Sequence, residues 1–105
     1  MEERRIHHRA QFQGKVECSE KAEIKAYDIS LSGIGIESNR NLQEGTVVFL
    51  LITLNAKGII KVIGRVAWTT EHTHNAYKCG VEFFSLTNYE QTKIKEYIED
   101  HHIDN

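Results

Sequence analysis

Isolated glycines divide the sequence into short segments rich in β-branched and aromatic residues, and proline is absent. Such segments are typical of β-strands, and the glycines between them are typical of turns and bulges. Six segments fit this description, at residues 12–18, 22–29, 34–37, 47–54, 59–68 and 77–84. No helical pattern lies between them, so the sequence predicts an antiparallel, mainly β fold rather than an alternating βαβ fold.

The segment at residues 59–68 indicates how the strands curve. Ile60, Val62, Val66 and Trp68 are spaced to share one face of a strand, with Gly64 between them. A glycine inside a long strand suggests a bend or bulge, which a small closed barrel requires. The pattern therefore favours a barrel, with these side chains on its core face.

Residues 47–52 form a continuous apolar run without the alternation of a half-exposed strand. Such a run predicts a strand that is covered on both faces. We expect its outer face to meet the helix or another subunit.

One helix is expected at the end of the chain. Thr87 and Glu90 have the spacing of a capping box, and Ile94, Tyr97 and Ile98 follow at helical spacing. The prediction is a helix over residues 88–101, within a C-terminal region at residues 86–102. With 105 residues, the chain has room for one core and one domain.

Composition excludes several classes of protein. The 13 basic and 15 acidic residues give a net charge of −2, which argues against a nonspecific binder of nucleic acid polymers. No apolar run is long enough to span a membrane, and the basic, polar first residues do not resemble a signal peptide. Two isolated cysteines argue against a disulfide scaffold. We expect a cytoplasmic protein with reduced thiols.

The first nine residues differ in character from the rest of the chain. Arg4, Arg5 and Arg9 accompany His7 and His8, without a core-facing pattern. We interpret residues 1–9 as an arginine-rich arm outside the barrel, which would occupy residues 10–85. The last ten residues are acidic instead, with Glu96, Glu99, Asp100 and Asp104.

Asp28, Ser30, Ser32 and Gly33 lie within six positions at the end of the second predicted strand. An aspartate has two acceptors that match the N1–H and N2–H donors of guanine, and serine hydroxyls can donate to phosphate. The arginines of the arm could bind the O6 and N7 of guanine or stack on the base. Taken singly, the cluster is also the signature of an Asx or serine turn, and terminal arginines are commonly solvated.

Taken together, the two clusters resemble the PilZ family of bacterial cyclic di-GMP receptors. Residues 5–9 match its RxxxR signature, and residues 28–33 match its [D/N]xSxxG signature. Residues 64–68 and 79–83 are similar to later strands of the family, so the resemblance covers essentially the whole chain. His8 departs from the proline that many relatives carry there, which leaves the arginines in place.

The resemblance implies a six-stranded antiparallel β-barrel with a C-terminal helix, and an arm that folds over the ligand. It implies that Arg5 and Arg9 bind guanine and phosphate, Asp28 binds the guanine edge, Ser30 binds a polar ligand atom and Gly33 forms the backbone turn. Arg4 precedes the RxxxR signature, as in relatives that bind two intercalated ligand molecules. We therefore expect two cyclic di-GMP molecules per chain.

Catalytic and metal-binding sites are not expected. The serines lack a GxSxG nucleophile elbow, and the histidine pairs, at residues 7–8, 72–74 and 101–102, lack i,i+4 or Cys-x-x-Cys ligand spacing. Trp68, Phe83 and Phe84 lie in apolar segments, where we expect them to be core residues rather than a stacking platform.

The leading hypothesis is a cyclic di-GMP receptor that passes the second-messenger level to a protein partner as its N-terminal arm becomes ordered. Since 105 residues leave no room for an output domain, it would act on an effector protein or by self-association, for example as a homodimer. The alternative is a PilZ-like adaptor that binds a partner through residues 47–52 or the acidic tail and uses no nucleotide.

Overall fold

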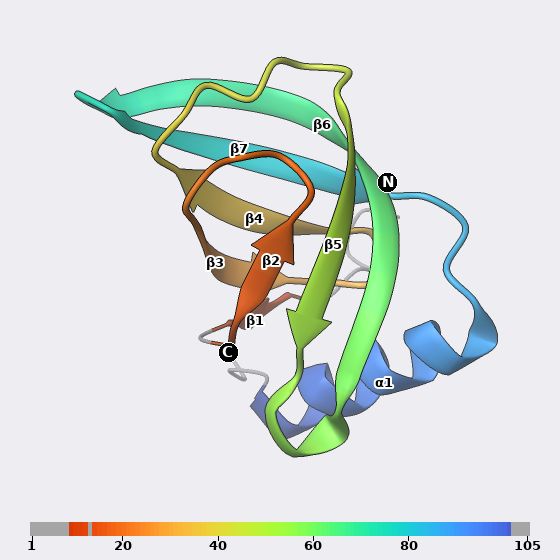
Figure 1. Cartoon of the computed structure of the whole chain (residues 1–105). Helices are drawn as coiled ribbons and strands as arrows, with labels where there is room; N and C mark the ends of the chain where they lie inside the picture. The colour runs from red at the N-terminus through yellow and green to blue at the C-terminus, as the bar shows by residue number, and fades with distance from the viewer. Residues whose placement is uncertain (1–8, 13, 102–105) are drawn as a thin grey trace, which may run out of the picture.

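A single curled antiparallel sheet with one helix makes up the fold (Figure 1). The computed structural model describes residues 9–12 and 14–101. The strands are β1 (Ala10–Gln11), β2 (Val16–Cys18), β3 (Ile24–Ile29), β4 (Gly33–Ser38), β5 (Val47–Thr53), β6 (Ile59–Thr73) and β7 (Ala76–Phe83). A 3-10 turn, η2 (Asn55–Lys57), joins β5 to β6, and the helix is α1 (Asn88–His101).

The prediction of a closed six-stranded barrel is wrong in strand number and in closure. The described residues form seven strands in the order β1-β3-β4-β7-β6-β5-β2, so that β1 and β2 are opposite edges of an open half-barrel. The error arises at residues 12–18, which were expected to be one strand. Phe12 is instead buried against the ring of Tyr97 after β1 ends, and the chain crosses to the other edge before β2 begins. Residue pattern alone does not reveal which strand each short piece pairs with.

The helix prediction is confirmed. The Thr87 amide donates to Glu90 Oε1 at 3.0 Å, and the Glu90 amide donates to Thr87 Oγ1 at 3.1 Å, which completes the capping box. Ile94, Tyr97 and Ile98 are buried against the open side of the sheet. No helix among the described residues is long and apolar enough to cross a membrane.

Within the described chain β5 is covered on one face only, so the expectation that the helix covers its outer face is wrong, and cover by another subunit stays a prediction. Val48, Leu50 and Ile52 are buried in the core, whereas Phe49 on the opposite face is 58% exposed. The strand does alternate between core and surface, but its surface positions also carry apolar side chains. No described part of the chain covers this outer face, and α1 packs elsewhere.

Two β-bulges change the direction of side chains that alternation would place in the core. In β3 the register shifts between Ala26 and Asp28, and in β6 it shifts between Val66 and Trp68. Because a bulge inserts one extra residue, the side chains after it point to the opposite face of the sheet from the one that simple alternation predicts. Asp28 and Trp68 therefore lie on the outer face, and the expectation that Trp68 is a core residue is wrong, since it is 43% exposed.

Candidate functional site

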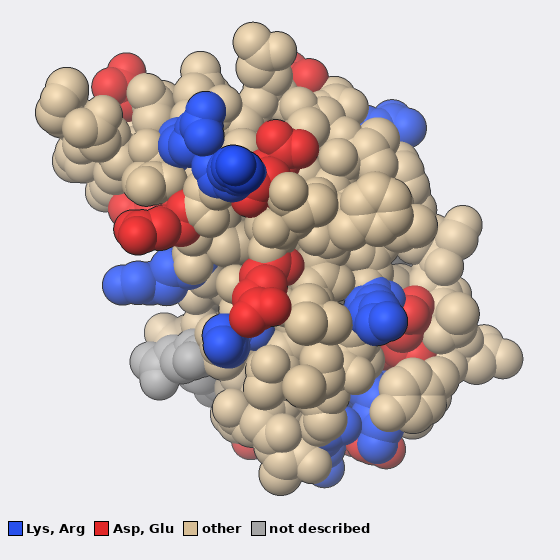
Figure 2. Space-filling view, viewed as in Figure 1, with Lys and Arg blue, Asp and Glu red and all other residues tan. Residues whose placement is uncertain are grey.

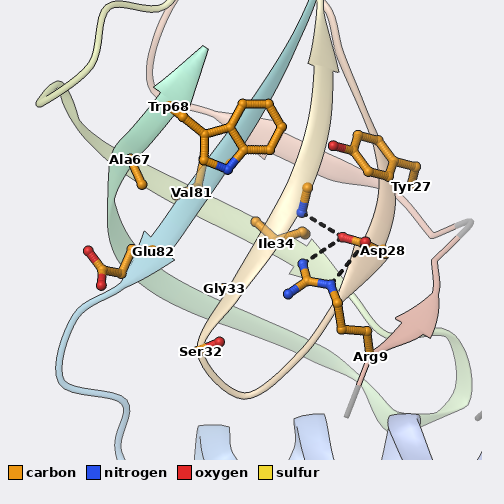
Figure 3. Close-up of a pocket in the computed structure, with 12 residues that line it drawn as sticks. Arg9, Tyr27, Asp28, Ser32, Gly33, Ile34, Ala67, Trp68, Val81 and Glu82 are labelled. Atoms are coloured by element: carbon orange, nitrogen blue, oxygen red, sulfur yellow. Dashed lines mark hydrogen bonds and ion pairs between the residues drawn. The ribbon is translucent and has the colours of Figure 1, made fainter. Parts of the chain in front are cut away.

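The two bulges create a shallow groove on the outer face of the sheet. Asp28 of β3 pairs with Gly35 of β4, Gly35 pairs with Gly80 of β7, and Gly80 pairs with Trp68 of β6. One row across four strands thus places a carboxylate and an indole on either side of two glycines (Figure 3). The groove has a volume of about 390 Å³. It can hold a flat ring system between an acceptor wall and an aromatic wall.

Gly35 and Gly80 leave space that the side chains of the two walls occupy. A Cβ added at Gly35 would lie 2.6 Å from Asp28 Oδ1 and 2.7 Å from the ring of Tyr27. A Cβ added at Gly80 would overlap the indole nitrogen of Trp68. Neither glycine has a positive φ, so each is required by close approach and not by backbone conformation.

Arg9 lies at the rim of the groove, immediately before β1, and binds Asp28 through two parallel hydrogen bonds. Its Nε donates to Asp28 Oδ2 at 3.0 Å, and its Nη2 donates to Asp28 Oδ1 at 2.7 Å. The Gly35 amide also donates to Asp28 Oδ1, at 3.1 Å. The hydrogen bonds to Asp28 raise the pKa of Arg9, so this guanidinium stays charged. The second arginine of the RxxxR signature and the aspartate of the [D/N]xSxxG signature therefore form one hydrogen-bonded pair.

Ser30 lies in the turn between β3 and β4 and supports that turn; it does not line the groove. Its side chain is fully buried, its hydroxyl accepts from Arg9 Nη1 at 3.3 Å and from the Ser32 amide at 3.2 Å, and the two serine hydroxyls are 3.0 Å apart. Ser32 lines the groove instead. Gly33 packs against β7, where a Cβ would overlap the Val81 carbonyl, and its φ is not positive.

The charges at the described groove are of both signs. Arg9, Asp28 and Glu82 line it, Arg65 of β6 pairs directly with Glu82, and the Lys78 ammonium lies 5.1 Å from the centre of the Tyr27 ring. Burial and the nearby Asp28 charge also raise the pKa of Tyr27, which stays neutral at the rim. Arg4 and Arg5 lie outside the described residues.

Sequence reasoning missed Trp68, Gly35, Gly80 and Tyr27 as site residues. Their convergence depends on the two bulges and on the pairing of β4 with β7, which join segments far apart in the chain. The only available signal was the presence of Gly35 and Gly80 inside strand-like segments, since such glycines can mark a close approach. Among residues 9–12 and 14–101, no group of three His, Cys, Asp or Glu side chains could hold a metal ion.

Several solved structures have a fold similar to that of this chain. The PilZ domain of Escherichia coli YcgR, described with c-di-GMP, superposes with a TM-score of 0.75 at 16% identity, covering 94% of this chain and 92% of that one. Bacillus subtilis MotI/DgrA, an inhibitor of motility, superposes with a TM-score of 0.78 at 20% identity over 93% of this chain. MrkH of K. pneumonia, in complex with c-di-GMP, superposes with a TM-score of 0.67 at 16% identity over 90% of this chain. The chain spans half of the MotI/DgrA and MrkH chains.

Sequence comparison supplies the family. No curated protein sequence matches the chain. The model of the PilZ domain, however, matches residues 3–100, which include both signatures and every strand. The chain therefore belongs to the PilZ domain family.

Proposed function

We propose that this protein is a cyclic di-GMP receptor, and that the groove between Asp28 and Trp68 holds a guanine of the ligand. The observation that carries the proposal is the paired Arg9–Asp28 unit at the rim of a groove whose floor is two glycines and whose far wall is an indole. The family membership and the c-di-GMP described with YcgR and MrkH support it. We assign no catalytic role to any residue and propose a cytoplasmic location.

Arg9 is prepared for a ligand by the contacts it already makes. A guanidinium has five N–H donors, of which Asp28 and Ser30 engage three. Two N–H donors remain, which suits the O6 and N7 acceptors of guanine. We infer that Asp28 orients Arg9, and that it binds the guanine edge directly only if Arg9 moves away. Ser30 and Gly33 shape the turn that fixes Asp28.

The RxxxR signature would add positive charge to the described groove. Arg5 precedes Arg9 by four residues, which is at most about 14 Å of extended chain, so its guanidinium can reach the groove. One cyclic di-GMP carries two phosphate charges and a stacked pair carries four, which Arg4, Arg5 and Arg9 would offset in part. We propose two ligands per chain, with binding that orders the part of the arm before Arg9 and presents a new surface to an effector protein.

Tryptophan fluorescence tests the proposal, because Trp68 is the only tryptophan in the chain. Titration with cyclic di-GMP is expected to change the emission in a saturable way as a base stacks near the indole. Cyclic di-AMP is the matched control, since adenine lacks the N1–H, N2–H and O6 pattern of guanine. Equal responses to both nucleotides, or no response to cyclic di-GMP, would contradict the assignment.

The second candidate function is a PilZ adaptor that binds a protein partner without nucleotide. The exposed apolar side chains of β5 and β6 favour it, because Phe49, Ile59 and Ile63 are each more than 40% exposed. Co-purification with and without cyclic di-GMP separates the two functions. A partner that is retained equally in both conditions would favour the adaptor.

A further inference from the structure

The outer face of β2, β5 and β6 carries an apolar patch that no described residue covers. The directly paired Phe49 and Ile63 are 58% and 42% exposed, and Val47 and Ile59 are 45% and 56% exposed. A groove of about 490 Å³ runs across this face, between Cys18 and Ser19 on one side and Ile63 on the other. Scattered single apolar side chains are normal at a surface, but a group on two adjacent strands, with a groove beside it, marks an interaction site.

One cross-strand row through the patch has charges of opposite sign at its two ends. Glu17 of β2 pairs with Leu51 of β5, and Leu51 pairs with Lys61 of β6, so one row reads acid, apolar, base. Figure 2 shows this face in the orientation of Figure 1, with mostly uncharged surface over β5 and charged atoms of both signs on either side of it. Glu17 also meets Lys15 at 3.2 Å, but both side chains are mostly exposed, so this pair is weak.

We propose that the occupant of this patch is a second copy of the same chain, packed face to face about a two-fold axis parallel to β5. Such an axis exchanges the β2 side with the β6 side. Glu17 of each copy then opposes Lys61 of the other, while Phe49 and Leu51 meet their own counterparts at the centre. A two-fold axis perpendicular to the strands would instead oppose Glu17 with Glu17, which like-charge repulsion disfavours.

Other occupants fit the charge pattern less well. An acidic peptide or an anionic membrane would favour a basic rim, and Glu17 opposes both. A self-complementary row with one charge of each sign is the property that a two-fold interface between copies requires. Two sheets can pack in this way at about 10 Å, with their exposed side chains interdigitated. The proposed dimer does not rest on nucleotide binding, because the Asp28–Trp68 groove lies over β3, β4, β7 and the distal part of β6.

Charge-reversal variants test the proposal. The oligomeric state of the full chain is measured by sedimentation velocity without nucleotide. The wild type is expected to show a reversible species of twice the 12.1 kDa chain mass as concentration rises. Lys61→Glu places like charges opposite each other at two points, and should weaken the dimer about tenfold or more. The double variant Glu17→Lys/Lys61→Glu restores opposite charges and should return the dissociation constant to within about threefold of wild type.

Phe49→Ser tests the apolar contact at the centre of the interface. This variant should be monomeric at concentrations where the wild type is dimeric. All substituted side chains are exposed, so unfolding temperatures close to wild type serve as the control for folding. A wild type that stays monomeric up to about 200 µM would overturn the proposal. A dimer that persists in Lys61→Glu and Phe49→Ser, or a double variant that stays as weak as Lys61→Glu, would also overturn it.

Discussion

Arg9→Ala should separate ligand binding from folding. In the folded chain Arg9 makes two hydrogen bonds to Asp28, at 3.0 and 2.7 Å, but its side chain is 46% exposed and that of Asp28 is 27% exposed. Solvent screens such a pair, so its loss should cost no more than about 1 kcal/mol of stability. For a domain of this size, the unfolding temperature should then fall by less than about 8 °C.

The effect on affinity should be much larger. A desolvated arginine that binds both the ligand and Asp28 typically contributes about 2–5 kcal/mol, which corresponds to a loss of about thirty-fold to several thousand-fold in affinity. Arg9→Lys is the matched control, because it keeps the charge but lacks the planar set of donors that engages Asp28 and a base together. We expect it to lose at least about tenfold.

Isothermal titration calorimetry with cyclic di-GMP measures these affinities, and differential scanning calorimetry measures the unfolding temperatures. Arg9→Ala binding within threefold of wild type would refute the role given to Arg9. A fall in unfolding temperature well beyond 8 °C would refute the reasoning on stability, since Arg9 would then be part of the structural framework.

The remaining predictions concern the groove, the arginine-rich arm, the helix and the thiol of Cys18. Gly80→Ala should displace the Trp68 indole and weaken cyclic di-GMP binding at least about tenfold, with a shift in tryptophan emission before ligand is added. Arg4→Ala should lower the calorimetric ratio from two ligands per chain toward one; an unchanged ratio of two would show that Arg5 and Arg9 suffice, and a wild-type ratio of one would remove the role of Arg4. Thr87→Ala removes the acceptor for the first turn of α1 and should cost about 0.5–2 kcal/mol in chemical denaturation. Burial raises the pKa of Cys18, so its alkylation should be slower at neutral pH than that of a free cysteine and keep rising at alkaline pH where a free thiol has reached its plateau.

Sequence patterns were most reliable where structure is local. The helix and its Thr87–Glu90 cap depend on residues three or four positions apart, and both are confirmed. The strand count failed at residues 12–18, because burial of Phe12 and the crossing between sheet edges are set by distant partners. Likewise, the side chains of β5 alternate between buried and exposed, but several exposed ones are apolar. The sequence shows which residues are apolar and not which are exposed, so the alternation could not be seen in it.

The candidate site was accessible from sequence only in part. The family resemblance indicated Asp28 and Arg9 as site residues, and the structure places them in direct contact. Trp68 was expected in the core, because an alternation of period two continues through residue 68 unless a bulge interrupts it. The register of β6 against β7 contains that bulge, and no local residue pattern requires it. Arg4 and Arg5 stay predictions, since they lie outside the described residues.

Calorimetric titration of the wild-type chain with cyclic di-GMP is the most direct test of the central claim, with Asp28→Ala as the matched variant. The account predicts saturable heat for the wild type and a loss of about thirty-fold or more in affinity for Asp28→Ala, which removes the group that orients Arg9. Absence of heat from the wild type at high micromolar ligand, or equal affinity in the two proteins, would contradict it.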